Sequence, residues 1–362
     1  MQIKSDGQTY APKGLANHVC GPDDFPVGII GLDHGHIYGM SNGLMEAGAK
    51  LALVYDPDPQ KVTEYCARYS QVKPARCKEE ILENDQIRMV LSASIPNERC
   101  PLGIEVMEHG KDFFTDKPPI TTAQQLNQAK DAVKRTGRKY AVYYSERRHV
   151  EAAVYAQKLL EEKAIGQVIS IAGFGPHRAS LPTRPQWFFE KEKYGGILVD
   201  IGCHQIEQML IYAGASDAAI EQSRIGNLYH PEYPGFEDFG DMTLTCSNGV
   251  AAYGQLHWFT PDGLGAWGDG RTIITGTDGY IELRKYIDVA RDKEGDHIYL
   301  VNHEGERHIK AAGTIGFPFF GQLIRDCLDG TSLAFDQEIE FKAIELAIQA
   351  EKQALRIHNP IE

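Results

Sequence analysis

The sequence predicts an α/β protein with two domains, a doubly wound parallel sheet first and a mostly antiparallel sheet after it. Three observations support this prediction. Short apolar segments alternate with helical patterns from Val27 to about Tyr144, which is typical of a parallel sheet covered by helices. After about residue 145, β-like segments follow one another with few helices between them. At 362 residues, the chain is long enough to form two hydrophobic cores.

The first half has the spacing of a βαβ series. Glycine follows several helical patterns, as at Gly48, Gly110 and Gly137, and glycine is common just after a helix. The expected strands are 27–30, 51–55, 87–93, 112–115 and 140–144, and the expected helices are 37–47, 58–69, 78–83, 98–109 and 122–136. Right-handed crossovers place the carboxyl ends of such strands along one edge of the sheet, where ligands bind.

The second half is rich in hairpin signals. Ser-Asn-Gly at 247–249 and Thr-Asp-Gly at 277–279 separate β-like segments, which indicates antiparallel pairing. The expected strands are 167–174, 224–229, 241–247, 250–259, 271–276, 280–285, 287–291 and 297–302, and the expected helices are about 149–162, 200–213, 316–329 and 336–356.

Composition excludes several classes of partner. The net charge of −13 argues against a nucleic acid or an anionic membrane surface, and no apolar run approaches membrane-spanning length. The seven cysteines are scattered and none forms C-x-x-C, which is typical of reduced thiols. The N-terminal residues lack the apolar core of a signal peptide. We therefore expect a cytoplasmic protein whose partner is a small molecule.

Residues 26–39 carry the strongest local motif. Val27–Ile30 is a short apolar run, glycines follow at Gly31 and Gly35, and a helical pattern begins at Ile37. A strand, a glycine turn and a helix open a dinucleotide-binding βαβ unit, because free N–H groups at a helix N-terminus hold a pyrophosphate. The match to G-x-G-x-x-G is imperfect. Asp33 and His36 stand at two of the glycine positions, and the charge of Asp33 is expected to repel the pyrophosphate.

The next strand supports a nucleotide at this turn. Asp56 follows residues 51–55, about where a carboxylate binds the adenosine ribose hydroxyls. Such a carboxylate favours NAD over NADP, because a 2′-phosphate would be repelled. The turn residues expected to bind the cofactor with Asp56 are Gly31, Asp33, His34, Gly35 and His36. The alternative is a βαβ unit without a nucleotide.

Two further strand ends have an unusual composition. Residues 92–97 are Ser-Ala-Ser-Ile-Pro-Asn, and small residues let a backbone approach a ligand closely. Residues 114–119 are Phe-Thr-Asp-Lys-Pro-Pro, in which two prolines fix Lys117 at the same predicted edge. Lys117 is therefore either a functional residue or a solvated surface lysine.

A possible acid–base pair lies in residues 194–208. Asp200 and His204 are four residues apart, so on a helix they share a face. A carboxylate and an imidazole on one face suit proton transfer, in which the carboxylate orients the ring or binds a substrate hydroxyl. The alternatives are a packed structural pair or a metal site.

Other polar residues could surround an anionic or polyhydroxylated ligand. Arginine and tryptophan in irregular segments are typical of ligand binding and equally typical of packing between domains. The candidates for substrate binding are Tyr144, Arg147, His177, Arg184 and Trp187. Three histidine-bearing segments make a zinc site worth considering, but none has the spacing of a strong zinc motif. We expect no bound metal.

With these residues in hand, the chain resembles the Gfo/Idh/MocA family of oxidoreductases (glucose–fructose oxidoreductase and inositol dehydrogenase). Four landmarks, in order, carry the resemblance: the turn at 27–47 with Asp56; Asp116-Lys117-Pro118 in place of Glu-Lys-Pro; Gly195-Gly196 leading to Asp200 and His204; and Thr-Gly-Thr-Asp-Gly-Tyr-Ile-Glu at 275–282. The departures are Asp33 in the turn, Asp116 for Glu, and Glu207 where relatives often have Asp.

The resemblance implies an N-terminal Rossmann domain and a C-terminal α/β domain with a large, open, mostly antiparallel sheet whose free face makes dimers or tetramers. It implies NAD or NADP as cofactor and sugars or polyols as substrates. By carry-over, Lys117 is the catalytic lysine, Asp200 the orienting acid and His204 the acid/base residue. Ser94 and Pro96 would lie beside the nicotinamide and ribose, with Asp116 and Lys117 also at the cofactor.

The sequence thus predicts an arm at 1–26, an NAD(P)-binding domain at 27–147, a substrate and oligomerisation domain at 148–330 and a closing helix at 331–362. The arm is either irregular or packed over the cofactor or a second subunit. The expected activity is hydride transfer between nicotinamide, as NAD rather than NADP, and a hydroxyl-bearing carbon of a sugar, polyol or derivative. The alternatives are an NAD-assisted lyase or hydrolase, a non-catalytic ligand or redox sensor, and a metal-dependent enzyme.

Overall fold

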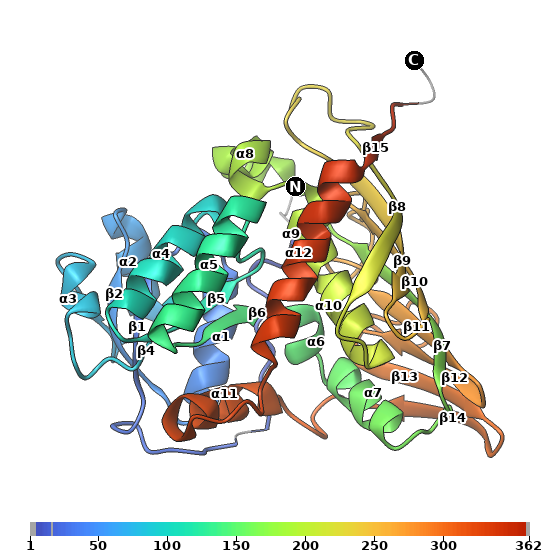
Figure 1. The fold of residues 1–362 in the computed structure, drawn as a ribbon, viewed down its shortest axis with the longest axis horizontal. Coiled ribbons are helices and arrows are strands. Elements are labelled where there is room, and N and C mark those ends of the chain that lie inside the picture. The colour runs from blue at the N-terminus through green and yellow to red at the C-terminus, as the bar shows by residue number, and fades with distance from the viewer. Residues whose placement is uncertain (1–4, 16, 360–362) are drawn as a thin grey trace. The chain divides into compact units, whose positions relative to one another are not determined.

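The computed structural model describes residues 5–15 and 17–359 (Figure 1). The chain forms two compact units. The parallel-sheet unit comprises residues 8–143 and 316–340, and the mixed-sheet unit comprises the described residues up to Gly7, residues 144–315 and those from Phe341 onward. The division after Tyr143 lies four residues before the predicted boundary, and the predicted closing segment 331–362 is shared between the units.

The parallel-sheet unit contains a six-stranded sheet in the order β3-β2-β1-β4-β5-β6, with every neighbouring pair parallel. Its strands are β1 (Pro26–Ile30), β2 (Lys50–Tyr55), β3 (Lys73–Pro74), β4 (Met89–Ser92), β5 (Asp112–Asp116) and β6 (Tyr140–Tyr143). Its helices are α1 (His36–Glu46), α2 (Pro59–Arg68), α3 (Glu79–Leu82), α4 (Pro96–Glu108), α5 (Ala123–Thr136) and α11 (Pro318–Asp329). The predicted doubly wound sheet is confirmed, and the short edge strand β3 was not predicted.

Local signals account for most of these elements. The Asp58 carboxylate caps α2 by accepting from Gln60 N, and Pro59 opens the helix. Thr122 caps α5 in the same way, and Gly137 ends that helix with a φ of 66°. One face of the sheet forms a core with α1, α2 and α11, while α4 and α5 pack side by side (Figure 1).

The described part of the arm from Gln8 to Phe25 packs along α1 of its own unit. The backbone carbonyl oxygen of Gln8 lies so close to Gly35 that a Cβ there would come within 2.7 Å of it. Farther along, Gly14 N donates to Glu46 Oε2 at 3.3 Å and Val19 N donates to Ala47 O at 3.0 Å. These contacts order the arm against the helix that follows the glycine turn.

The mixed-sheet unit contains a nine-stranded sheet in the order β14-β13-β12-β11-β7-β10-β9-β8-β15. Its strands are β7 (Val168–Pro176), β8 (Ala218–Gly226), β9 (Phe239–Cys246), β10 (Ala251–His257), β11 (Arg271–Gly276), β12 (Gly279–Arg284), β13 (His297–Asn302), β14 (Gly305–Lys310) and β15 (Leu355–Arg356). Only the pairs β7–β10 and β8–β15 are parallel, so the predicted mostly antiparallel sheet is confirmed.

Helical segments cover one side of this sheet (Figure 1). Helices α7 (Glu151–Glu161), α9 (Ile197–Asp200) and α10 (Gly202–Ala213) pack against its strands. The unit also contains α6 (Ser145–Arg148), the 3₁₀ segments Leu181–Thr183 and Gln186–Phe189, α8 (Lys191–Tyr194) and most of α12 (Gln337–Gln353). The single helix predicted at 200–213 is wrong in one respect, because Asp200 ends α9 and α10 begins after Ile201.

Two strand predictions were wrong because side chains turn the backbone. Residues 287–291 form a loop in which Asp288 accepts from Ala290 N, and Asp292 likewise accepts from Glu294 N. Such local bonds compete with strand pairing. The strand predicted at 224–229 instead begins at Ala218 and ends at Gly226, because the Asp238 carboxylate binds the two following amides, at 228 and 229.

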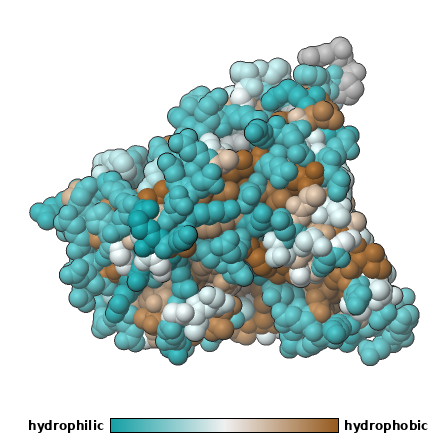
Figure 2. Space-filling view, in the orientation of Figure 1, coloured by the Kyte–Doolittle hydropathy of each residue, from teal (hydrophilic) through white to brown (hydrophobic). Residues whose placement is uncertain are grey.

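The other face of the mixed sheet carries exposed apolar side chains. On β11, Ile273 is 37% exposed whereas the next residue, Ile274, is fully buried, as expected where one face is covered and the other is open. Phe259, just after β10, and Tyr280 on β12 are also exposed. Figure 2 shows hydrophobic residues reaching the surface around the strands of this unit. Within the described residues, no helix is both long and apolar enough to span a membrane.

Candidate cofactor and catalytic sites

The glycine turn after β1 is tied to the ends of both neighbouring strands. Gly31 N donates to Tyr55 O at 3.1 Å, Ala93 N donates to Gly31 O at 3.1 Å, and His34 N donates to Ala93 O at 2.9 Å. Gly31 has a φ of +87°, and a Cβ there would lie 2.7 Å from the Cβ of Ser94. Only glycine fits this conformation and this contact. The turn and the Ser94 segment thus form one surface at the carboxyl edge of the sheet.

Asp56 lines a cavity of about 550 Å³ beside this turn. Its carboxylate is nearly buried and accepts from Leu32 N at 2.7 Å and from Asp58 N at 2.9 Å. The cavity is lined by Gly31, Asp33, Asp56, Asp58, Lys61, Ser94 and Ile95, among others. A cavity at the end of β2, with a carboxylate and a close-packed glycine turn, fits the adenosine end of a dinucleotide.

Asp33 does not present the uncompensated charge that the sequence suggested. Lys61, in the first turns of α2, places its Nζ 2.6 Å from Asp33 Oδ1 and 4.0 Å from Asp56 Oδ1. Burial lowers the pKa of Lys61, but the carboxylates, Asp33 first, outweigh it, so the net pKa is raised. The expectation that Asp33 repels a pyrophosphate is therefore corrected, because the neighbouring ammonium offsets its charge.

His34 and His36 both contact a buried carboxylate, that of Asp116, at the end of β5. Their Nδ1 atoms lie 3.0 and 2.8 Å from the oxygens of Asp116. Burial and the neighbouring His36 lower the pKa of His34 to about 4, although Asp116 opposes this. Burial would raise the pKa of Asp116, but His36, Arg99 and His34 hold it well below its usual range. His34 is therefore a neutral imidazole, and it lies beside the ionised carboxylate of Asp116.

These three side chains could also hold a metal ion. One ligand atom from each of His34, His36 and Asp116 lies within 4.8 Å of the others. The carboxylate is already engaged, however. Asp116 Oδ1 accepts from Lys117 N at 2.7 Å, and Oδ2 lies 3.2 Å from the guanidinium of Arg99. The donors present therefore satisfy the carboxylate as a hydrogen-bonded cluster.

Arg99 joins the carboxyl ends of β4 and β5, a role that the sequence analysis missed. Its Nε donates to Ser94 O at 2.7 Å, and its other nitrogens donate to the carbonyls of Lys117 and Pro118 and to Asp116. It is 1% exposed. The only signal available was an arginine one turn after Pro96 in a predicted helix. Arg99 fixes the backbone on both sides of Lys117, which is itself buried and precedes a cis peptide bond.

Asp200 and His204 are both buried residues of the mixed-sheet unit. The backbone of α9 continues in the right-handed helical region through Ile201, so these residues lie about one turn apart on successive short helices. The imidazole of His204 contacts the ring of Tyr144, with centroids 6.0 Å apart.

The predicted substrate-binding residues differ in how far the protein already engages them. Arg147 binds Glu207, with Nε 2.9 Å from Oε1, and also donates to Gln157. Arg184 donates to the carbonyls of Ala179 and Arg178, and its guanidinium lies 4.4 Å from the ring centroid of Phe188. These contacts fit a scaffold role for both arginines.

Trp187 is nearly buried and packs against Phe188, with ring centroids 6.3 Å apart. Tyr144 is fully buried. Among the five substrate candidates, His177 stands beside a cluster of charged residues that the sequence did not reveal.

That cluster is centred on Glu146 of α6. Its Oε2 accepts from Lys285 Nζ at 3.0 Å and from Gln205 Nε2 at 2.8 Å. Lys285 is fully buried and also donates to Gln208 Oε1 at 2.6 Å. Burial would raise the pKa of Glu146, but Lys285, His204 and His177 outweigh it and lower that pKa to about 2. Because 139 residues separate Glu146 from Lys285, no local pattern could have predicted the pair.

Comparison with known proteins identifies the class. Residues 25–144 match the oxidoreductase family with an NAD-binding Rossmann fold, and residues 153–282 match the GFO/IDH/MocA C-terminal domain. The chain belongs to the Gfo/Idh/MocA family of NAD-binding oxidoreductases.

Individual relatives agree with this assignment. A crystal structure from Erwinia carotovora atroseptica, assigned as an oxidoreductase without a named substrate, is 44% identical, with a TM-score of 0.89 over 92% of this chain and 99% of that one. scyllo-Inositol 2-dehydrogenase (NAD⁺) of Bacillus subtilis is 26% identical over 65% of this chain and 66% of that protein. Levoglucosan dehydrogenase of Pseudarthrobacter phenanthrenivorans is 26% identical over 56% of this chain and 52% of that protein. The chain thus aligns with between half and two thirds of these two dehydrogenases.

Levoglucosan dehydrogenase in complex with NADH and levoglucosan shares the fold, with a TM-score of 0.75 at 19% identity.

Proposed function

We propose that this protein is an NAD-dependent dehydrogenase of a sugar, a polyol or a related hydroxylated compound. The observation that carries the proposal is the cavity of about 550 Å³ that brings the Gly31 turn and Asp56 together at the carboxyl edge of the parallel sheet. NAD, when bound there, would accept hydride from a hydroxyl-bearing carbon. Relatives named for scyllo-inositol and levoglucosan support the substrate class.

The charges of the cavity favour NAD over NADP. Five carboxylates and two lysines line it, the carboxylates being those of Asp33, Asp56, Asp58, Glu98 and Glu105. Lys61 contacts Asp33, and Lys78 is paired with Glu105 at 2.7 Å. A 2′-phosphate would meet a net negative surface, whereas ribose hydroxyls can donate to Asp56.

The chemical roles follow the family landmarks. His204 would accept the hydroxyl proton, Asp200 would orient the substrate or the imidazole, and Lys117 would stabilise the developing oxyanion with its ammonium. The buried contacts of Arg99 with Asp116 and with the carbonyls around Lys117 would hold that lysine in place.

Titration of the full chain with NADH and, separately, NADPH tests the cofactor assignment. We expect nicotinamide fluorescence to report tight binding of NADH and weak binding of NADPH. Asp56→Ser should weaken NADH binding at least tenfold, while Glu64→Gln, on the exposed side of α2, should leave it unchanged. Absence of NADH binding, with no nucleotide released on denaturation, would refute the proposal.

A screen of sugars and polyols with NAD⁺ then tests the chemistry. On any substrate found, Lys117→Ala and His204→Ala should each reduce kcat at least a hundredfold. Full turnover by either variant would rule out the role assigned to that residue.

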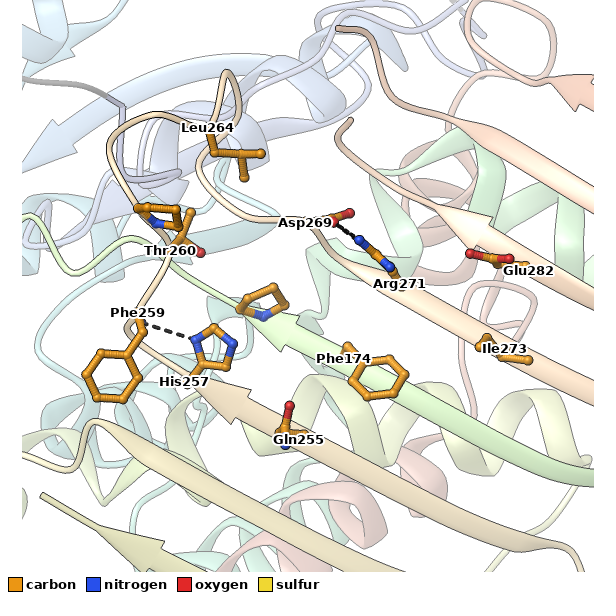
Figure 3. Close-up of a pocket in the computed structure, with 12 residues that line it drawn as sticks. Phe174, Gln255, His257, Phe259, Thr260, Leu264, Asp269, Arg271, Ile273 and Glu282 are labelled. Atoms are coloured by element: carbon orange, nitrogen blue, oxygen red, sulfur yellow. Dashed lines mark hydrogen bonds and ion pairs between the residues drawn. The ribbon is translucent and has the colours of Figure 1, made fainter. Parts of the chain in front are cut away.

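We also propose that the open face of the mixed sheet joins copies of this chain into a homodimer or homotetramer. This face holds a cavity of about 510 Å³ lined by Phe174, His257, Phe259, Arg271, Ile273 and Glu282, among others (Figure 3). Arg271 is paired with Asp269 there, and His257 Nδ1 accepts from Phe259 N at 3.1 Å. Light scattering should show an oligomer that Ile273→Glu dissociates. A monomeric native protein would refute this assembly.

A further inference from the structure

One oxygen of the Glu146 carboxylate is left without a donor. Oε2 is occupied by Lys285 and Gln205, but among the described residues Oε1 has no hydrogen-bond partner. The residue is 3% exposed. An ionised oxygen in this position is costly unless a positive group faces it.

The imidazole of His177 lies beside that oxygen. Its Nε2 lies 4.0 Å from Glu146 Oε1, while its Nδ1 lies 3.0 Å from the backbone carbonyl of Gly175. Because a carbonyl can only accept, Nδ1 carries a hydrogen in either charge state of the ring. In the neutral ring, Nε2 would then direct a lone pair at the carboxylate, whereas in the imidazolium it would direct an N–H.

Two indole rings flank the same imidazole. The ring centroid of His177 lies 5.2 Å from that of Trp258 and 4.6 Å from that of Trp267. Indole rings attract cations at such distances. The aromatic contacts and the unpaired oxygen of Glu146 therefore each favour the protonated form of His177.

We propose that Glu146 is a positioning residue that keeps His177 protonated near neutral pH, so that the positive charge of the imidazolium can attract an oxygen of the substrate. Its role in turnover rests on the proposed dehydrogenase function, but the protonation state does not. Glu146 acts through its carboxylate, which Lys285, the residue after β12, keeps ionised.

The other charged and titratable groups around this carboxylate come from separate elements. His204 lies on α10, Lys285 follows β12, and His177 follows β7. The positive charges of Lys285 and of a protonated His204 oppose protonation of His177, but Lys285 is bound to Glu146 Oε2 and to Gln208 Oε1. The free oxygen, Oε1, faces His177.

The test is a direct titration of His177 in the full-length protein. The 13 histidines are labelled with ¹³C at Cε1, and the His177 signal is assigned from its loss in His177→Asn. We expect a pKa for His177 above the ordinary histidine value of about 6.5. Glu146→Gln keeps the shape and removes the charge, and it should lower that pKa by at least about one unit.

Glu151→Gln is the matched control. Glu151 is another buried carboxylate of the mixed-sheet unit, and it binds the backbone amide of Ile315 at 2.9 Å. Removing the charge of Glu151 should leave the pKa of His177 unchanged. A native His177 pKa at or below about 6.5, or a drop in Glu146→Gln no larger than in Glu151→Gln, would overturn the proposal. Should Glu146→Gln fail to fold, the native titration alone decides.

Kinetics with a substrate separate this inference from the proposed function. Loss of the His177 proton in Glu146→Gln should raise KM more than it lowers kcat and should move the basic limb of the kcat/KM profile to lower pH. Failure of NADH to bind would refute the dehydrogenase, while the NMR titration would still decide the state of His177.

Discussion

Asp116 and Glu146 are both buried carboxylates next to histidines, yet they are satisfied differently. Asp116 accepts from the Lys117 amide and from His36 on one oxygen and meets Arg99 on the other. Glu146 binds Lys285 and Gln205 through one oxygen and leaves the other without a hydrogen-bond partner among the described residues. His34 also lies 3.0 Å from the second oxygen of Asp116, so each oxygen of this carboxylate already has two neighbours, whereas one oxygen of Glu146 has no hydrogen-bond partner among the described residues.

The difference has a consequence for the neighbouring histidines. A saturated carboxylate adds little further stabilisation to a proton, so burial wins and the pKa of His34 falls to about 4. An unsaturated carboxylate can hold a proton on His177. The contrast indicates that the Asp116 cluster is a scaffold for the cofactor turn and Lys117, and that the Glu146 cluster can take part in proton chemistry.

Removing Arg99, the cation beside Asp116, should have the largest effect on the free energy of unfolding. Arg99→Met leaves Asp116 charged and buried and removes donors from the carbonyls of Ser94, Lys117 and Pro118. We expect a loss of about 4–5 kcal/mol in the free energy of unfolding, measured in urea. Arg135→Ala, which breaks an exposed pair with Glu108, should cost less than about 1 kcal/mol. Equal losses in the two variants would show that Arg99 does not stabilise the carboxyl ends of β4 and β5.

Removing Lys285, the cation beside Glu146, should lower the free energy of unfolding by somewhat less. Lys285→Met leaves Glu146 facing Gln205 and the histidines, and we expect a loss of about 3 kcal/mol. The exposed control Lys158→Met, which loses the pair with Glu162, should change stability by less than about 0.5 kcal/mol.

The pH dependence of this variant sharpens the comparison. The folded-state pKa of Glu146, about 2, lies below its ordinary value, so its stabilising contribution is present above about pH 4.5 and is lost as the pH falls toward 2. Lys285→Met should therefore lose less stability than the native protein between pH 5 and pH 3. An unchanged slope would mean that Lys285 does not hold the carboxylate ionised.

The neutral state of His34 predicts a smaller effect at mildly acidic pH. Its folded-state pKa of about 4 lies below the unfolded value of about 6.5, so the unfolded chain binds the proton first and stability falls as the pH drops from 6.5 toward 4. Between pH 7 and pH 5 this group should account for roughly 1–2 kcal/mol. His34→Asn should remove that part of the slope, whereas His303→Asn, on an exposed turn, should keep it.

The smallest effect is expected from metal removal. Because the donors around Asp116 are already in place, we expect the purified protein to contain far less than one transition-metal ion per chain and chelation to leave stability unchanged. Elemental analysis after purification without chelator checks this. A near-stoichiometric ion that disappears in His36→Ala would make the cluster a metal site.

Much of the fold could be predicted because its signals are local. The five predicted strands of the parallel sheet and the helices between them follow from apolar runs, helical spacing and caps such as Asp58 and Gly137. The failures at 224–229 and 287–291 arose where aspartate side chains, such as Asp288, bind backbone amides and turn the chain. Strand propensity gives no warning of such turns.

The sequence by itself determined the order of the elements, the glycine turn and the place of Asp56 at a strand end, because each depends on neighbours in the chain. Only the tertiary structure decided the charge partners. Lys61 is paired with Asp33 across 28 residues, Arg99 with Asp116 across 17, and Lys285 with Glu146 across 139. Hydrophobic periodicity specifies which face of an element is buried, but the electrostatic state of a buried group depends on which distant charges the folded chain brings to it.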